Sequence, residues 1–272
     1  MAPRVPFPPS NHSQHLVLSP PPDHTPPANH PLTTPSFFPY YPPEGQSSIQ
    51  RHWTDFRPIL NLTSPSLSCN FPGTPAEQSA TLPAGGTIAA YYRGWPHTVG
   101  PIIVWMAYCG GLPTSCDGFD ASQGRHWFKI AETGLVEGTV KEGVWAQGRM
   151  VGGNDTWVVT VPGGLREGAY LMRHEVIALH VPFAPEFYPE CAHLFVTGGG
   201  GQVPGEEFLV EIPGVWREDG EFARFLAVLC REVGDGALTD GHADPELYLS
   251  IYEEPTASRA EWTIPGPPVW SP

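Results

Sequence analysis

The chain has 272 residues, and its 14 lysine and arginine residues against 28 aspartate and glutamate residues give a net charge of −14. A charge this negative argues strongly against nucleic acid or an anionic membrane as a partner. Hydrophobic residues make up 40% of the chain, which is enough for a packed core and excludes a wholly disordered protein. The longest apolar run, Pro101 to Cys109, is too short to cross a bilayer.

The N-terminal arm is dominated by proline. Of the chain's 34 prolines, 14 lie in the first 43 residues, where Arg4 and Asp23 are the only charged side chains. This composition predicts a disordered or polyproline-type segment over residues 1–57. Leu16 to Leu18 is too short for the hydrophobic region of a signal peptide and has prolines on both sides, so no signal peptide is recognised.

From about Pro58 the pattern changes to short apolar runs separated by glycine and proline turns. Such runs, without a convincing long amphipathic helix, predict an all-β sandwich with long loops over residues 58–272. The predicted strands are Thr87–Tyr92, Ile102–Ala107, Trp127–Ile130, Trp157–Val161, Tyr170–His180, Leu194–Thr197 and Phe208–Ile212.

One segment interrupts the strand pattern. Residues Glu221 to Val233 place apolar side chains at helical spacing and include Cys230. We interpret Gly220–Ala243 as an insertion, which is either a surface loop or a translated intron. The intron interpretation is favoured because Cys230 has no obvious partner.

The five cysteines are an odd number, so at least one is unpaired or pairs outside the chain. Cys109 and Cys116 are close enough in sequence to close a small loop, whereas Cys69 and Cys191 would join distant segments. Cys230 is left over.

Asn11, Asn61 and Asn154 each begin a glycosylation acceptor triplet. Such triplets are common by chance and support secretion only weakly. Together with the cysteines, they fit a secreted, extracellular protein best.

Two stretches carry a family resemblance. Residues Gly168 to Thr197 place His180 after an apolar run, followed by Tyr188 and Cys191, and His97 lies just before the apolar run that begins at Ile102. The sequence resembles the fungal lytic polysaccharide monooxygenases of auxiliary-activity family nine, which are secreted, copper-dependent, cellulose-oxidising enzymes formerly classed as glycoside hydrolases. The resemblance implies an immunoglobulin-like or fibronectin-like β-sandwich, and we expect disulfides between Cys69 and Cys191 and between Cys109 and Cys116.

In this family one copper ion is held by three nitrogens, namely the amine and ring of an N-terminal histidine and the ring of a second histidine. The resemblance assigns His97 as the second histidine and Tyr188 as the residue on the axial position of copper. Imidazole nitrogen suits copper well. The alternatives are that His97 is a turn histidine with local hydrogen bonds and that Tyr188 is a buried tyrosine packed beside the disulfide.

His180 and Glu186 match residues that lie beside the copper without binding it. His180 corresponds to a histidine that hydrogen-bonds the oxygen species, and its ring suits proton donation near neutral pH. Glu186 stands where the family usually has glutamine, so a charged acceptor replaces an amide. His174 lies too far along the same strand to serve the same copper, and we expect it, with Arg173 and Glu175, to be structural.

The C-terminal segment contains Trp262 and Trp270 on either side of Ile264-Pro265-Gly266-Pro267, a signature of the family. The resemblance implies that these aromatic side chains contact the flat, neutral face of cellulose. The alternative is that one or both pack in the core.

The resemblance covers about Pro58–Glu218 and Asp244–Trp270. It requires an N-terminal histidine some forty or more residues before the first cysteine, and the context of His52 does not match. We therefore expect the sequence to lack the first strand and its histidine through a misassigned first exon, which leaves an exposed sheet edge.

The function implied by the resemblance is oxidative cleavage of cellulose or a related β-1,4-glucan by hydroxylation at C1 or C4. The reaction uses O2 or H2O2 and an external electron donor, such as a small reductant or a flavin-haem dehydrogenase, and the protein is expected to be a monomer. One alternative is an inactive truncated relative that only binds polysaccharide or serves as a cell-wall module. A hydrolase that uses two of Glu175, Glu186 and Glu190 is weaker, because no spacing selects a pair.

Overall fold

The computed structural model describes residues 13–17, 48–54, 56–217, 244 and 246–272. Their strands form two packed sheets, which confirms the predicted β-sandwich. No helix within these residues is long and apolar enough to cross a membrane. The predicted insertion Gly220–Ala243 and its Cys230 lie outside the described residues.

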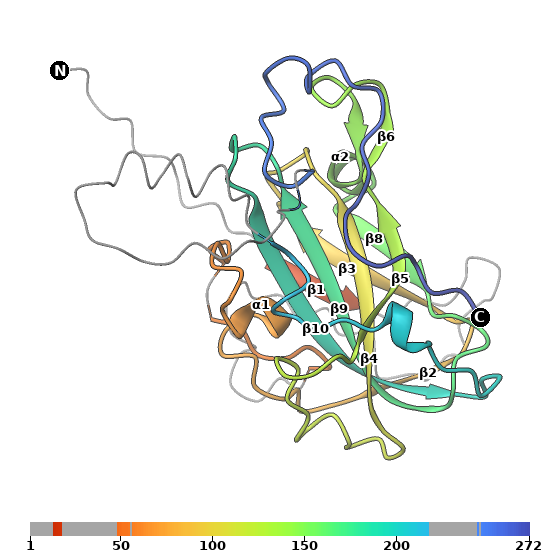
Figure 1. Ribbon diagram of the computed structural model, residues 1–272. Coiled ribbons are helices and arrows are strands. Elements are labelled where there is room, and N and C mark those ends of the chain that lie inside the picture. The colour runs from red at the N-terminus through yellow and green to blue at the C-terminus, as the bar shows by residue number, and fades with distance from the viewer. Residues whose placement is uncertain (1–12, 18–47, 55, 218–243, 245) are drawn as a thin grey trace.

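The larger sheet has five strands in the order β2, β10, β9, β4 and β5. β2 runs parallel to β10, and the other neighbours are antiparallel. In Figure 1, β9, β10 and β4 run side by side through the middle of the molecule. Their bounds are β2 Ala80–Pro83, β4 Ile102–Gly110, β5 Trp127–Thr133, β9 Gly168–Ala178 and β10 Glu186–Thr197.

The smaller sheet has three antiparallel strands in the order β1, β3 and β8. A ribbon of β6 and β7 leads directly into helix α2, which lies near one end of the sandwich (Figure 1). The bounds are β1 Ser13–Val17, β3 Thr87–Arg93, β8 Thr156–Thr160, β6 Leu135–Glu137, β7 Val144–Trp145, α1 Ser66–Cys69, α2 Ala146–Gly152 and the 3₁₀ helix η1 Glu206–Phe208.

Six of the seven predicted strands overlap observed strands, and the prediction for Phe208–Ile212 is wrong. There, η1 ends at Phe208, and Val210 forms an isolated bridge with Trp127. Both backbone hydrogen bonds of Val210 go to Trp127, the first residue of β5. The segment therefore passes the end of that strand instead of running along it.

One short part of the N-terminal arm is a strand within the segment that was predicted to be disordered or polyproline-type. Residues Ser13–Val17 form β1, which covers the edge of β3 from Arg93 to Ala89. Ser13–Val17 contains no proline, so each of its amides can donate to a neighbouring strand.

The packed domain also begins earlier than the predicted boundary at residue 58. The amide of Arg51 donates to the carbonyl of Cys191 in β10, and the Arg51 side chain is buried. Its guanidinium donates to the carbonyls of Cys116 and Phe119 at 2.8 and 3.1 Å and to Nε2 of His193 at 3.2 Å. A buried arginine requires this many partners, so the segment around it is fixed.

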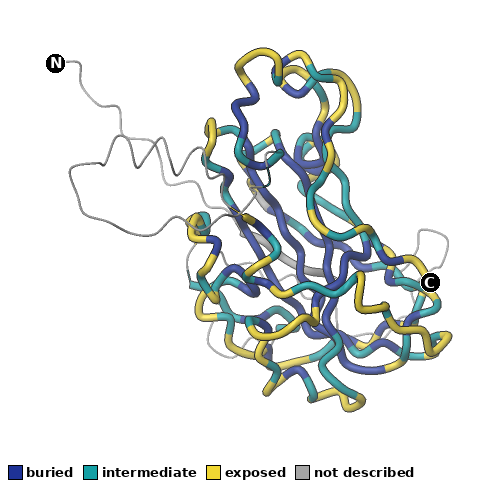
Figure 2. Tube along the Cα trace, in the orientation of Figure 1, coloured by how far each residue is buried: buried dark blue, intermediate teal, exposed yellow. Residues whose placement is uncertain are grey.

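Both faces of the larger sheet are buried. One face packs against β3 and β8 through side chains that include Ile88, Val104 and Met172. The opposite face packs against α1 and the C-terminal segment through Trp105, Leu171 and other side chains. Figure 2 shows the buried positions running along the central strands, while the loops are more exposed. Burial on both faces explains why β9 is buried at every position.

Arg173 and Glu175 are buried charged residues on the face of the larger sheet that packs against α1. Arg173 donates to the carbonyls of Ser68 and Leu67 and pairs with Glu175. Glu175 also accepts hydrogen bonds from the indoles of Trp105 and Trp216 at 2.9 and 3.1 Å. The Glu175 carboxylate and the Nε and Nη2 atoms of Arg173 are thus hydrogen-bonded to protein atoms, which supports the structural role predicted for both residues.

His174 points to the opposite side, where its Nδ1 lies 2.6 Å from the hydroxyl of Tyr92. Burial lowers the pKa of His174 to about 3, so its imidazole stays neutral. A neutral, buried histidine bonded to a tyrosine fits the predicted structural role.

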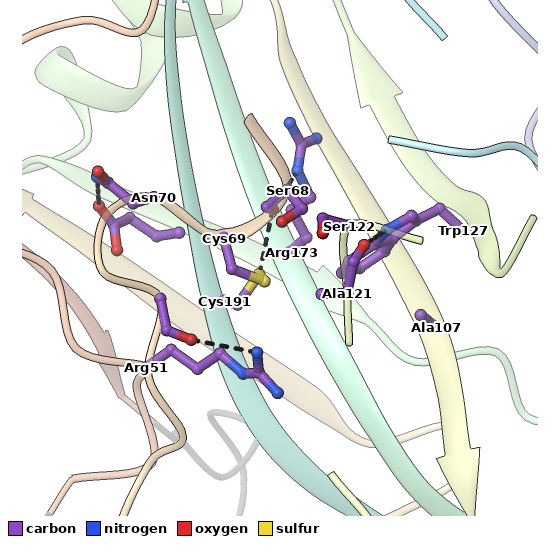
Figure 3. Close-up of a disulfide and its surroundings, with 12 residues drawn as sticks. Arg51, Ser68, Cys69, Asn70, Ala107, Ala121, Ser122, Trp127, Arg173 and Cys191 are labelled. Carbon is purple, nitrogen blue, oxygen red and sulfur yellow. Dashed lines mark hydrogen bonds between the residues drawn. A yellow bond between two sulfur atoms is a disulfide. The ribbon is translucent and has the colours of Figure 1, made fainter. Parts of the chain in front are cut away.

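Both disulfides expected from the sequence are present. Cys69, at the end of α1, is joined to Cys191 in β10 across 122 residues, and Cys109 is joined to Cys116 across seven. Figure 3 shows the first bond between Arg51 on one side and Arg173 on the other. The long-range bond therefore holds α1 against the central sheet.

A buried carboxyl also fastens the arm to this region. Glu190 in β10 accepts hydrogen bonds from the amide groups of Asn70 at 2.8 Å and Gln50 at 3.1 Å. Burial outweighs these two bonds and raises the pKa of Glu190 from 4.5 to about 8. The folded protein therefore binds a proton that the unfolded chain releases above pH 4.5.

We expect Glu190 to make the protein less stable as pH rises from 4.5 to about 8. The stabilisation is complete below pH 4.5 and is lost through this window, at no more than about 1.4 kcal/mol per pH unit. Urea unfolding at several pH values should give a shallower decline for Glu190→Gln than for the unmodified protein. The matched control is Glu137→Gln at an exposed position; equal slopes in all three proteins would contradict the prediction.

Candidate metal centre

Three segments meet at one end of the larger sheet. His97 lies in the loop before β4, His180 follows the end of β9, and Glu186 is the first residue of β10. The pairing of Glu186 with Ala178 fixes β10 beside β9. The amide of Leu179 donates to the carbonyl of Val99, which ties the end of β9 to the His97 loop.

The two histidine rings are stacked. Their centroids are 4.4 Å apart with an angle of 20° between the planes. Nε2 of each ring lies 3.8 Å from the same carboxylate oxygen, Oε2 of Glu186. His97, His180 and Glu186 therefore present three metal-ligating atoms that all lie within 4.8 Å of one another.

Tyr188 joins this cluster from the next inward-facing position of β10. Its hydroxyl donates to Oε2 of Glu186 at 2.9 Å and lies 3.2 Å from Nε2 of His97. Burial, followed by the charge and hydrogen bond of Glu186, raises the pKa of Tyr188 well above its ordinary value of 10. The phenol therefore stays protonated and serves as a hydrogen-bond donor at neutral pH.

Trp95 forms the inner wall of the site. Its ring packs edge-to-face against His97 and Tyr188, with centroid separations of 5.2 and 4.9 Å. Its indole NH donates to Oε1 of Gln147 in α2 at 3.0 Å. The side-chain amide of Gln147 donates in turn to the carbonyls of Val99 and Ile177 at 3.3 and 2.9 Å.

Gly100 allows this close approach of loop and strand. Its φ angle is 130°, in a region that disfavours other residues. A Cβ at this position would lie 2.0 Å from the carbonyl oxygen of Ile177. The glycine thus brings the His97 loop directly against the end of β9.

The site therefore brings together the four residues predicted from the sequence, His97, His180, Glu186 and Tyr188. The two tryptophans predicted to contact the substrate, Trp262 and Trp270, lie elsewhere and are buried. Trp262 is 9% exposed and packs against Trp145, and Trp270 is 5% exposed and packs against Phe128.

Burial of these rings has a clear physical cause. The indole NH of Trp262 donates to the carbonyl of Glu246 at 2.9 Å, so its polar edge is satisfied inside the protein. The edge-to-face contacts of both tryptophans then fix the C-terminal segment on the sandwich. This outcome matches the core-packing alternative.

Sequence reasoning missed Gln147 and Tyr252. Gln147 has no detectable signal, because a buried amide cannot be distinguished from an exposed one in a single sequence. Tyr252 is 49% exposed, and its hydroxyl donates to the carbonyl of His180 at 3.0 Å. The sequence Tyr252-Glu253-Glu254-Pro255 is typical of an exposed turn and could have indicated an accessible aromatic ring beside the site.

Known proteins match this chain over most of its length. The model for Auxiliary Activity family 9 (formerly GH61) matches residues 30–225. AA9 family lytic polysaccharide monooxygenase B of Heterobasidion irregulare is 40% identical over 237 residues, which cover 86% of this chain and 85% of the relative. AA9 family lytic polysaccharide monooxygenase D of Thermothelomyces thermophilus is 38% identical over 237 residues, which cover 85% and 81%.

Solved structures show the same architecture. The crystal structure of HiLPMO9B has 39% sequence identity and a TM-score of 0.70, and the match covers 85% of this chain and 90% of that chain. The crystal structure of a cellulose-active polysaccharide monooxygenase from M. thermophila has 36% identity and a TM-score of 0.67, with coverage of 87% and 92%.

Replacing Gln147 by methionine, which is similar in size, should destabilise the protein by about 2 to 5 kcal/mol, because it removes the hydrogen bonds of the side-chain amide to the Trp95 indole and to the carbonyls of Ile177 and Val99. Chemical denaturation measures this loss. The exposed Gln202→Met variant is the control and should change stability by less than about 0.5 kcal/mol. Equal stability of the two variants would show that the Gln147 amide does not hold the wall of the site.

Proposed function

Because this chain belongs to Auxiliary Activity family 9, we propose that it is a copper-dependent monooxygenase that oxidatively cleaves cellulose or a related β-1,4-glucan. The reaction hydroxylates C1 or C4 of a glycosidic linkage, and the bond then breaks. With O2, two electrons from an external donor and two protons are consumed and water is released. With H2O2, the C–H bond becomes C–OH and water is released without added electrons.

The observation that carries this proposal is the convergence of His97, His180, Glu186 and Tyr188 at one end of the sheet. The donor set fits copper, because Nε2 of His97 is a partly exposed imidazole nitrogen with a phenol 3.2 Å away. His97 would hold the ion, and Tyr188 would lie beside it. Copper bound there would supply the one-electron chemistry with O2 or H2O2 that side chains do not provide.

The other groups of the site handle protons and orientation. An imidazole can both donate and accept a proton, and Nε2 of His180 lies 3.8 Å from Oε2 of Glu186. Tyr188 donates to that same oxygen and holds the carboxylate in place. His180 and Glu186 would therefore hold and deliver the protons that the O2 reaction consumes.

The substrate would lie across the exposed rim next to His180. Tyr252 provides a half-exposed ring there. Phe183, which is 37% exposed, lies in the β9–β10 connection that also contains His180. The amide of Phe183 donates to the carbonyl of Leu249, so this connection and the Tyr252 segment are joined. Aromatic faces of this kind suit stacking on the flat apolar face of a sugar ring.

The setting for this chemistry is extracellular. Both described disulfides fit an oxidising compartment. Asn61 and Asn154, which begin two of the acceptor triplets, are exposed.

We expect His97→Ala to abolish tight copper binding, because it removes the imidazole donor of the site. Isothermal titration with copper measures the loss, and assay of oxidised cellulose fragments with a reductant measures activity. The exposed His126→Ala variant is the control and should keep both properties. Unchanged copper affinity in His97→Ala would overturn the proposed site, and cellulose binding without oxidised products would favour a polysaccharide-binding module.

Tyr252→Ala should weaken cellulose binding about five- to tenfold, because stacking of one aromatic ring contributes about 1 kcal/mol. A pull-down isotherm on crystalline cellulose measures the affinity. Copper affinity should not change, since the Tyr252 side chain contacts the backbone of His180 and none of the site's donor atoms. Val158→Ala at an exposed position on β8 is the control for general loss of surface hydrophobicity; equal effects of the two variants would contradict the assignment.

A further inference from the structure

We propose that Asn61 is a site of N-linked glycosylation, so that the secreted protein carries an oligosaccharide on the turn before α1. The triplet Asn61-Leu62-Thr63 has the acceptor sequence, and the structure adds the exposure and conformation that sequence alone does not reveal. This inference rests on the extracellular setting proposed above, because the modification takes place in the secretory pathway. It does not depend on the copper chemistry.

The triplet alternates between the surface and the core. Asn61 and Thr63 are exposed, whereas Leu62 between them is 5% exposed and packs in the core on the α1 side of the larger sheet. Leu60, which precedes Asn61, is 58% exposed. The two residues that an oligosaccharide-transferring enzyme must reach therefore face solvent, and the buried leucine holds them there.

The side chain of Asn61 is held in an Asx turn. Its Oδ1 accepts hydrogen bonds from the amide of Thr63 at 2.9 Å and from the hydroxyl of Thr63 at 2.8 Å. Nδ2, the atom that would carry the sugar, has no hydrogen-bond partner among the residues that the structure describes. Because both bonds join residues only two positions apart, the chain can form this turn before the rest of the domain folds.

Two attachments to β10 fix the turn in the folded protein. Before the turn, the backbones of Ile59 and Phe187 exchange two hydrogen bonds. After the turn, α1 ends at Cys69, whose disulfide joins it to Cys191. An oligosaccharide on Asn61 would thus project from a surface turn that is fastened to the central sheet on both sides.

The other exposed acceptor asparagine, Asn154, has a different geometry. The hydroxyl of Thr156 donates to the backbone carbonyl of Asn154 at 3.0 Å and not to its side chain. Asn154 and Asp155 have φ angles of 62° and 54°, a left-handed conformation that is uncommon outside glycine. Of these two triplets, the geometry therefore favours Asn61.

The reaction is a group transfer without oxidation or reduction. Nδ2 of Asn61 attacks the anomeric carbon of an oligosaccharide that is linked to a lipid diphosphate. A C–N bond forms while the bond from that carbon to the diphosphate oxygen breaks. The diphosphate leaves with the electron pair, and Nδ2 gives up one proton. The acceptor pattern requires a hydroxyl at its third position, which Thr63 supplies.

The test is peptide mapping of the full chain, secreted from a fungal host behind a cleavable signal peptide. Release of the sugar by an amidase in heavy-oxygen water converts a glycosylated asparagine to a labelled aspartate, which mass spectrometry locates. We expect the label at position 61 in most of the secreted molecules. A bare Asn61 would overturn the proposal, and unchanged copper binding by the same sample would leave the proposed function intact.

Matched variants show whether the triplet itself directs the modification. Thr63→Val keeps the size of the side chain but removes its hydroxyl and should lose the label at Asn61, whereas Thr63→Ser should keep it. Asn154→Gln is the control and should also keep it. Asn61→Gln should lower the intact mass by one oligosaccharide and leave copper affinity unchanged, since its hydrogen bonds stay within the triplet. Retention of the label in Thr63→Val would contradict the assignment.

Discussion

The antiparallel pairing of β9 with β10 is the constraint on which the rest of the structure depends. β9 is buried on both faces, so the sheet it belongs to needs packing layers on either side. The register that pairs Glu186 with Ala178 determines where the two strands end and therefore which side chains meet there. Because side chains alternate across a strand, Glu186 and Tyr188 then face the same side. A shift of one residue would turn both away from His97.

The two faces of this sheet accommodate buried polar side chains in different ways. On the α1 side, Arg173 and Glu175 pair with each other and with backbone carbonyls and indoles. On the β3 side, His174 stays neutral against Tyr92. Arg173 and Glu175 therefore balance each other's charge within the core, whereas Glu186 lies at the end of the sheet beside His97 and His180.

Much of the fold and site could be predicted from this sequence, because strand runs and the motif around His180 and Tyr188 are local patterns. The misses have specific physical causes. Burial of Trp262 depends on the hydrogen bond that its indole donates to the carbonyl of Glu246. The position of residues 48–54 depends on hydrogen bonds that the Arg51 guanidinium donates to distant carbonyls, including that of Cys116. β1 pairs with a strand more than seventy residues later in the chain, which local composition cannot reveal. The role of Gln147 could not be predicted for the same reason, since its hydrogen-bond partners come from a loop and from β9.

Tyr252, the proposed substrate contact, lies on a different segment from the side chains of the proposed copper site. Tyr252 lies on the C-terminal segment, and its hydroxyl donates to the backbone carbonyl of His180, whereas His97 lies in the loop before β4 and Tyr188 lies in β10. Under the proposed function, changes in the length or composition of that segment would alter the polysaccharide surface that the protein contacts without moving a donor atom of the site. In evolutionary terms, exchange of this peripheral segment would adapt one copper site of the proposed kind to different polysaccharide surfaces.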